Sequence, residues 1–436
     1  MAICKHRDLA TGVSSHANEV GYSRPTTQQR IAATQPSGQV SSKSGDLHGV
    51  PPDSTFPAPL VLPGDELSCN PKYPPQSLRS WIQGTYRNPV TARRSTIYLV
   101  PPPTVDASVS FVQAWAQPEG VKGRRPELPA TQHVLEYLQA FYHGLEVKML
   151  PADEPRFAAW QDGSRKKRVE SRKLPPISLA MGTVATRIRS RASYDGTFAG
   201  QLNLNDLLDA AINLLPDDAY AMLMLVEHDL YEDEDDDFCC GRAYGGSRIA
   251  VVSMARYNPL LDDTQEVERE HPWPASHCKA FVDGSCSGHF SPPPRKKARK
   301  GTSSEEVALP TKKTAMAAAV AAHCRLKKPT STEDLSNVWL GRVCKTGSHE
   351  LGHCFGLDHC IYYACLMQGT TGLSEDAGQP PYLCPVDSAK LTRATGAVYE
   401  IERDKALLGF CEKFGKDRLF SAFAAWLRFR LDEEER

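Results

Sequence analysis

The stretch HELGHCFGLDH, residues 349–359, fits the pattern H-E-x-x-H-x-x-G-x-x-H at every fixed position. On a helix, His349 and His353 lie four residues apart and face the same side, so both imidazoles can bind one tetrahedral zinc ion. Glu350 follows the first histidine and lies beside the metal, where a carboxylate can accept a proton from zinc-activated water. The motif therefore predicts a helix that carries two zinc ligands and a general base.

The end of the same stretch predicts a third ligand. Gly356 lets the backbone leave the helix sharply, because a positive φ is cheap only for glycine. The turn then brings His359 back toward the metal. Three protein ligands leave the fourth position open for water, which distinguishes a catalytic zinc from a structural one. A chance match is the alternative, and five fixed positions within eleven residues argue against it.

Cysteines follow the histidine motif closely. Cys360 comes directly after it, Cys365 and Met367 follow, and Cys384 and Asp387 lie beyond a polar loop. In a reducing compartment, cysteines at such spacing indicate ligands of a second zinc.

The stretch HELGHCFGLDHCIYYACLMQG, followed by YLCPVD, resembles the archaemetzincin family, whose signature extends the metzincin motif with H-C-x4-C-x-M and C-x-x-C. The resemblance covers residues 194–393 and, more faintly, 74–150. It implies an α/β fold with a zincin-like (metzincin) catalytic domain, a mixed sheet and an active-site helix. It also implies that Cys360, Cys365 and Cys384 bind a structural zinc and that Met367 forms the Met-turn under the histidines.

One position departs from the family signature, because its fourth cysteine is Asp387 in this chain. A carboxylate can bind zinc, so a site of three cysteines and one aspartate is chemically reasonable. Alternatively, Asp387 only caps the following turn. Cys354 is a rival fourth ligand, but it points about 100° around the helix from His353, and we favour a packing role for it.

Composition predicts how the chain is organised. Residues 1–73 are rich in Ser, Gln, Thr, Pro and Gly, so we expect a disordered N-terminal tail. Residues 74–436 are expected to form the catalytic domain. Within it, residues 262–332 break the pattern of the neighbouring sequence and predict an insertion that is flexible at least in its middle.

Periodicity predicts the elements of the α/β domain. Residues 130–142 and 202–215 indicate helices, the second with Asn205 as its cap, and a helix from 333 runs into the zinc motif. The C-terminal part, 395–431, is expected to be helical. Strands are expected at residues 95–100, 145–150, 219–227, 238–244 and 247–254. The run 219–227 is so apolar that we expect it to be buried on both faces of the sheet.

Charge and targeting signals limit the possible partners. Lys plus Arg (51) nearly balance Asp plus Glu (52), so the whole chain favours neither nucleic acid nor an anionic membrane. The start of the chain lacks a signal-peptide pattern, and no apolar run is long enough to span a bilayer. We therefore expect an intracellular protein, cytoplasmic or nuclear. The basic segment from Arg295 to Lys300 is the candidate nuclear signal, and a solvated charge run is the alternative.

A further group of potential ligands is not expected to bind metal. The residues His271, His277, Cys278, Cys286 and His289 lie within the insertion. Their spacing fits no metal-binding pattern, so we interpret them as unrelated positions. Cys239 and Cys240 are expected to be core residues, because buried free cysteine behaves as a small hydrophobe.

The sequence thus predicts a zinc-dependent metallopeptidase that acts on peptides or proteins and binds two zinc ions per chain, one catalytic and one structural. The substrate is expected along an edge strand, for which residues 247–254 are the candidate. Whether the enzyme trims termini, as an aminopeptidase, or cuts internally stays open, as do the physiological substrate and the oligomeric state. The alternative function is an inactive, zinc-stabilised peptide- or protein-binding module.

Overall fold

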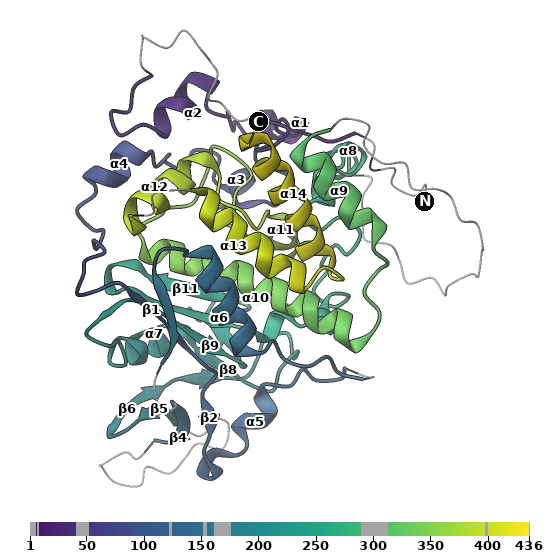
Figure 1. Ribbon diagram of the computed structural model, residues 1–436. Coiled ribbons are helices and arrows are strands. Elements are labelled where there is room, and N and C mark those ends of the chain that lie inside the picture. Colours follow the sequence, from purple (N-terminus) through teal and green to yellow (C-terminus); the bar gives the residue numbers. More distant parts are fainter. Residues whose placement is uncertain are drawn as a thin grey trace, which may run out of the picture. The chain divides into compact units, whose positions relative to one another are not determined.

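The computed structural model describes residues 6, 8–40, 52–121, 124–150, 155–160, 176–288, 313–396 and 400–435 (Figure 1). The chain forms two compact units. The helical unit comprises Met1–Thr85, Asp262–Gly341 and Leu357–Arg436. The sheet unit comprises Tyr86–Leu261 and Arg342–Gly356. These boundaries differ from the predicted ones, which separated a tail, a catalytic domain and an insertion.

A mixed five-stranded sheet lies in the sheet unit, with the order β11-β12-β9-β1-β3. Its strands are β1 (Thr96–Val100), β3 (Glu146–Met149), β9 (Ala219–Val226), β11 (Gly241–Tyr244) and β12 (Ile249–Ser253). Neighbouring strands are parallel except for β11, which pairs antiparallel with β12. All residues of β9 are buried, which confirms the predicted burial on both faces.

The sheet corrects the predicted substrate edge. Strand β12, within the predicted range 247–254, pairs with β11 on one side and β9 on the other, so its backbone groups are already used. Strand β11 is the edge on this side of the sheet. The sequence marked both segments as strands, but pairing partners are tertiary information that strand propensity does not carry.

Smaller elements complete the sheet unit. A four-stranded sheet has the order β2-β4-β5-β6 and a three-stranded sheet the order β10-β8-β7. Their strands are β2 (Thr104–Val105), β4 (Arg156–Ala159), β5 (Ile177–Met181), β6 (Val184–Ile188), β7 (Ser190–Arg191), β8 (Gln201–Asn203) and β10 (Asp229–Tyr231). The helices are η1 (Ala107–Val109), α5 (Val112–Trp115), α6 (Thr131–Phe141), α7 (Leu204–Ile212), η2 (Gly245–Ser247), η3 (Ala255–Tyr257) and η4 (Pro259–Leu261).

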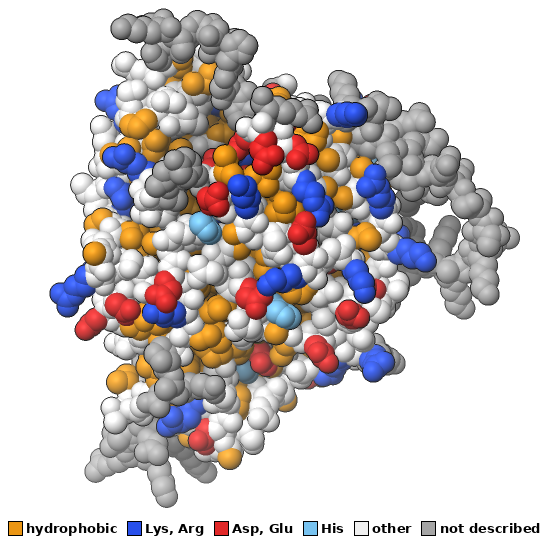
Figure 2. All heavy atoms as spheres, in the orientation of Figure 1, with side chains coloured by type: hydrophobic (Ala, Val, Ile, Leu, Met, Phe, Trp, Pro, Cys, Tyr) orange, Lys and Arg blue, Asp and Glu red, His pale blue; other side chains and the backbone are white. Residues whose placement is uncertain are grey.

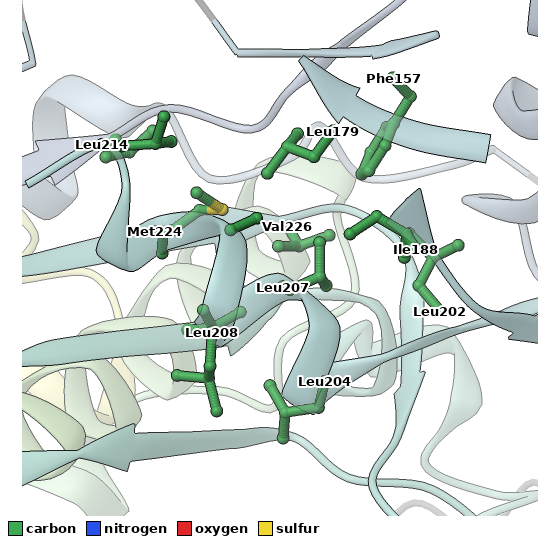
Figure 3. Packing of buried hydrophobic residues seen from close by; sticks show 14 of the residues in the cluster. Phe157, Leu179, Ile188, Leu202, Leu204, Leu207, Leu208, Leu214, Met224 and Val226 are labelled. Atoms are coloured by element: carbon green, nitrogen blue, oxygen red, sulfur yellow. The ribbon is translucent and has the colours of Figure 1, made fainter. Parts of the chain in front are cut away.

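One hydrophobic core cluster contains side chains from the sheets and from helix α7 of the sheet unit (Figure 3). Met224 and Val226 of β9 and Leu207 and Leu208 of α7 are fully buried in it. Each such side chain contributes about 1.5–3 kcal/mol relative to an exposed position.

The cap of α7 differs from the prediction. The N-cap is Asn203, whose side chain accepts a hydrogen bond from the Asp206 backbone N–H, and not Asn205. Asparagine is a favoured N-cap residue, so both positions were plausible. The helix begins after Asn203 because strand β8 ends at that residue.

The helical unit consists of short and long helices. They are α1 (Ser15–Glu19), α2 (Thr27–Ala33), α3 (Glu66–Cys69), α4 (Leu78–Gln83), η5 (Ala275–His277), α8 (Lys279–Cys286), α9 (Ala315–Arg325), α11 (Leu373–Gly378), α12 (Pro385–Thr395), α13 (Glu400–Lys413) and α14 (Arg418–Glu434). The last long helix, α14, packs against α9 and α13. The predicted helical C-terminal part is therefore confirmed over α13 and α14.

The prediction of a disordered tail is wrong for the part of residues 1–73 that the structure describes. Helices α1 to α3 form there, and Ala17 and Tyr22 are buried. The Tyr22 hydroxyl donates to the Ile361 carbonyl oxygen at 2.6 Å. A polar composition shows that a segment cannot form a core alone, but this segment adds its few apolar side chains to a core that Ile361 completes.

The predicted insertion is ordered over its described ends. Residues 262–288 and 313–332 belong to the helical unit and include η5, α8 and α9. Its predicted flexible middle lies outside the described residues, and so does the basic segment 295–300.

On the face that Figure 2 shows, acidic and basic side chains are interspersed. Among the described residues, no helix has the length and apolar character needed to cross a membrane.

Candidate metal centres

The zinc motif lies on a long helix, α10 (Thr332–Cys354), as the sequence predicts. Its C-terminal part is buried almost completely: from residue 343 to 354, only His349 and His353 are partly exposed. The Tyr142 hydroxyl donates to the Ser348 carbonyl oxygen at 2.6 Å, just before the first histidine. The helix is thus fixed in position, and the two histidines are the side chains it presents outward.

The three histidines of residues 349–359 converge. One ring nitrogen each from His349, His353 and His359 lies within 4.8 Å of the others. The Nε2 atoms of His349 and His353 are 3.0 Å apart. Two ligands of one tetrahedral zinc, each about 2.0–2.1 Å from the metal, would be about 3.3 Å apart. The cluster therefore fits a zinc ion.

Glycines shape the surroundings of this helix end. Gly356 has φ = 74°, which confirms the predicted exit from the helix. Beside Glu350, a side chain added at Gly241 of β11 would lie 3.4 Å from its Cγ atom. A side chain at Gly245, in the turn after β11, would collide with the His353 carbonyl oxygen. Edge strand β11 and its turn therefore lie directly against the part of α10 that carries Glu350 and His353.

His359 has neighbours that the sequence analysis did not predict. The Glu66 Oε1 atom lies 3.0 Å from His359 Nδ1. The ring of Tyr73 lies against the His359 ring, with centroids 5.7 Å apart. Both residues come from the predicted tail. The apolar run FPAPLVL at residues 56–62 was the signal in that region that some of it is buried.

Four further side chains form a second cluster. One ligand atom each from Cys360, Cys365, Cys384 and Asp387 lies within 4.8 Å of the others, and all four residues are buried. The Cys360 and Cys384 sulfur atoms are 3.6 Å apart, and both are free thiols. Ligands of one zinc at the usual Zn–S distance would be about 3.8 Å apart.

The Asp387 carboxylate divides its contacts between the sulfur atoms and a lysine. Its Oδ2 lies 3.3 Å from Cys365 Sγ and 3.4 Å from Cys384 Sγ, close to the roughly 3.6 Å of zinc ligands. Its Oδ1 accepts a hydrogen bond from Lys390 Nζ at 2.8 Å. Among the described residues, the Asp387 contacts are to these cysteine sulfur atoms and to Lys390, and no hydrogen bond from the backbone of the following turn to its carboxylate is seen.

The chemistry of this second cluster also fits a cation. Burial raises the pKa of the Cys365 and Cys384 thiols well above the usual value, and it raises the pKa of the Asp387 carboxyl to about 7. Negative charge at this position is therefore costly unless a cation compensates it. Lys390, which is itself buried, supplies one positive charge on the far side of the carboxylate. The sequence did not reveal this lysine, whose only signal was its position three residues after Asp387.

Met367 is fully buried in the loop between the two groups of cysteines. Its carbonyl oxygen accepts a hydrogen bond from the Cys360 backbone N–H at 2.7 Å. The residue therefore lies in a closed turn that begins at the second cluster.

The remaining cysteines and histidines are not grouped as metal ligands in the part of the chain that the structure describes. Cys354 is buried, as expected for a packing residue. His271, His277 and Cys278 are buried, Cys286 is partly exposed, and His289 lies outside the described residues. Cys239 and Cys240 are partly exposed, so they are less buried than predicted.

Known proteins resemble this chain over most of its length. The model of peptidase family M54 matches residues 313–393. Archaemetzincin-2 of Homo sapiens is 25% identical over 370 residues, which is 84% of this chain and 78% of that protein. Archaemetzincin-1 of Mus musculus is 26% identical over 279 residues, 64% of this chain and 41% of that protein. The crystal structure of archaemetzincin from Methanopyrus kandleri aligns with 17% identity and a TM-score of 0.32, covering 70% of this chain and 97% of that one.

The M54 match includes both clusters in full, from His349 to Asp387. The relatives extend the similarity over more than four fifths of the chain. The chain is therefore similar to the archaemetzincins, and these matches indicate a zinc metallopeptidase with peptide or protein substrates.

Proposed function

We propose that His349, His353 and His359 hold the catalytic zinc and that Glu350 is the general base of peptide-bond hydrolysis. The observation that carries the proposal is the convergence of the three ring nitrogens within 4.8 Å. It is supported by the exposure pattern of α10, whose buried C-terminal part presents only two of these histidines. A site that binds a substrate needs this combination of fixed ligands and one open side.

Zinc, when bound, supplies a Lewis acid that polarises a carbonyl oxygen and acidifies water. The other steps belong to the chain. Glu350, adjacent to the first ligand, accepts the proton of the attacking water and returns it to the leaving amine. Its side chain is nearly buried, so a proton held there exchanges little with bulk water before the amine leaves.

The substrate is proposed to pair with edge strand β11. This strand replaces the predicted segment 247–254, whose partners occupy both sides. Gly241 and Gly245 bring the backbone of β11 and its turn close to Glu350 and His353. An extended peptide added to this edge would receive backbone hydrogen bonds next to the general base.

The cluster of Cys360, Cys365, Cys384 and Asp387 is proposed to hold a second, structural zinc. Four ligands that are all buried leave no open position for a substrate. Met367 is proposed as the Met-turn residue beneath the histidines, and the sheet unit as a zincin-like fold. An aminopeptidase-like mode is the narrower proposal, and its support is the archaemetzincin resemblance.

The test compares wild type with Glu350→Gln on a peptide library. We expect the cleavage rate to fall by about 10²–10⁴-fold, because a general base contributes that much, while zinc content stays unchanged. Glu333→Gln is the matched control, an exposed glutamate on the same helix. Unchanged cleavage by Glu350→Gln would refute the mechanism. Zinc-loaded but inactive wild type would favour the alternative, a zinc-stabilised binding module.

The same library distinguishes the mode of cleavage. Blocking the peptide amino terminus should abolish cleavage by an aminopeptidase and leave an endopeptidase unaffected. Nuclear import through Arg295–Lys300 is a separate proposal. A tagged Lys296→Ala/Lys297→Ala variant that distributes like wild type would exclude it.

A further inference from the structure

A carboxylate from the N-terminal part of the chain lies against one of the three clustered histidines. Glu66, on α3, places its Oε1 atom 3.0 Å from His359 Nδ1. The two side chains are 22% and 28% exposed, so solvent screens this contact only in part. A carboxylate only accepts hydrogen bonds, so Nδ1 is the protonated nitrogen, and Nε2 is the nitrogen left for a metal.

We infer that Glu66 is a positioning residue for the third zinc ligand. It fixes the tautomer and the ring orientation of His359 and increases the basicity of Nε2. Carboxylates that bind the second nitrogen of a ligating histidine have this effect at zinc sites in general. The inference rests on the proposed role of His359, and it assigns to the N-terminal segment a part in the catalytic centre.

The helix that carries Glu66 is anchored from two sides. The next residue, Leu67, is buried in a cluster with Val61 and Ile361. The Glu66 backbone N–H donates to the Glu375 carboxylate, with distances of 3.0 and 3.2 Å to its two oxygens. Burial raises the pKa of Glu375 to about 8, and its carboxylate also accepts hydrogen bonds from the Thr371 backbone N–H at 2.8 Å and the Thr371 hydroxyl at 3.3 Å. The side chain of Glu66 is therefore directed at His359 by fixed neighbours.

Gly369 makes room for the contact. A Cβ atom added there would overlap the Glu66 carboxylate and the His359 ring. Gly369 is buried, so its backbone has little space to move away. Glycine is thus required because two functional side chains meet against its backbone.

A second pair of contacts holds the residue before His359. The Gln76 side-chain amide donates to Asp358 Oδ2 at 2.9 Å, and the Asp358 backbone N–H donates to Gln76 Oε1 at 3.2 Å. Together with the Tyr73 ring, which lies on His359, these contacts bind residues 66–76 to 358–359. Glu66 and Tyr73 of the segment that composition marked as disordered therefore contact the third histidine, and Gln76 just beyond that segment holds the residue before it.

The test measures zinc affinity at the histidine site by competition with a chelator, in the full chain. We expect Glu66→Ala to lower this affinity about 10–100-fold and to leave the zinc of the cysteine site unchanged. Glu66→Gln keeps the size of the side chain and an acceptor oxygen but not the charge, so its loss should be smaller. Substitution of cobalt gives a second readout, because the visible spectrum of the histidine site should change in Glu66→Ala.

Glu19→Ala is the matched control, since this exposed glutamate of the same N-terminal region contacts His16. Wild-type affinity and an unchanged cobalt spectrum in both Glu66 variants would overturn the inference. If Glu66→Ala unfolds, Glu66→Gln decides, because it preserves the shape. Wild type that binds no zinc at the histidines would instead refute the proposed function.

Gly369→Ala tests the same contact sterically, because its Cβ atom would push the Glu66 carboxylate and the His359 ring apart. We expect it to weaken zinc binding as Glu66→Ala does, and the double variant to be no weaker than the worse single variant, because both remove one contact. Additive losses would show that Gly369 acts independently and would contradict this explanation of the glycine.

Discussion

The two clusters use ligands from neighbouring parts of one chain, residues 349–359 and 360–387, but differ in burial. All three histidines are partly exposed, whereas all four members of the cysteine cluster are buried. The first set consists of ring nitrogens, and the second has three cysteine sulfur atoms and a carboxylate that pairs with a buried lysine. In the assignment proposed above, an ion in the first cluster would reach a substrate, and an ion in the second would only hold the chain together. Burial, more than ligand type, would then separate the two roles.

The largest expected effect is the loss of thermal stability when the second cluster loses one ligand. Cys365→Ser removes one buried thiolate, and loss of a structural metal belongs to the few changes that cost above about 4 kcal/mol. We expect the melting temperature to fall by at least about 8 °C in a thermal scan. His353→Ala should abolish peptide cleavage and change the melting temperature by far less.

Cys286→Ser on α8 is the control, because this cysteine lies outside both clusters. The assignment of roles would be contradicted if the melting temperature of Cys365→Ser equalled that of the control while the melting temperature of His353→Ala fell strongly.

The next effect concerns metal removal. A chelator should empty the histidine site at least about tenfold faster than the cysteine site, because buried ligands are reached only through local unfolding. Cleavage should stop when about one zinc per chain has been released. Zinc release measured with a coloured indicator, alongside activity, checks this order, and activity that outlasts the release of the first zinc contradicts it.

A smaller effect on the free energy of unfolding is expected when the buried lysine is replaced. Lys390→Met leaves the Asp387 carboxylate without its partner, and we expect the free energy of unfolding to fall by up to about 3–5 kcal/mol. A bound cation should reduce this loss, since it compensates the same carboxylate. Denaturant titrations with and without added zinc measure both values, and an equal loss in the two conditions would argue that Asp387 binds no metal.

The smallest effect uses a buried histidine outside both clusters. Burial lowers the pKa of His228 to about 4, while its Nε2 donates to the Val112 carbonyl oxygen at 3.0 Å. In the unfolded chain, the His228 ring takes up a proton below about pH 6.5, whereas in the folded chain it stays neutral down to about pH 4. The free energy of unfolding therefore falls by about 1.4 kcal/mol per pH unit between pH 6.5 and pH 4. His228→Gln keeps a donor for Val112 and should lose less stability between pH 7 and pH 5 in denaturant titrations.

Much of the architecture could be predicted because the local signals were strong. The apolar run of β9 and the glycine that ends α10 both act through local chemistry, and the structure confirms both. The strands of the five-stranded sheet and the helices α6 and α7 fall within a few residues of the predicted ranges, whereas the strands of the two smaller sheets were not predicted. The clusters follow the motif spacing, since their members lie on one helix and the loop and helix after it.

The errors share a physical cause, which is dependence on distant residues. Glu66 and Tyr22 looked solvated by composition, yet each contacts a residue about three hundred positions away in the sequence. The edge of the sheet was placed at β12 because strand propensity does not encode order. Lys390 could not be recognised as the partner of Asp387 before its burial was known.

The most direct test of two zinc sites with different roles is a crystal structure with anomalous scattering measured at the zinc edge. Two peaks per chain are expected, one bonded to His349, His353 and His359 and one to Cys360, Cys365, Cys384 and Asp387. A single peak at the histidines, with the cysteine cluster empty or closed by a disulfide, would contradict this expectation.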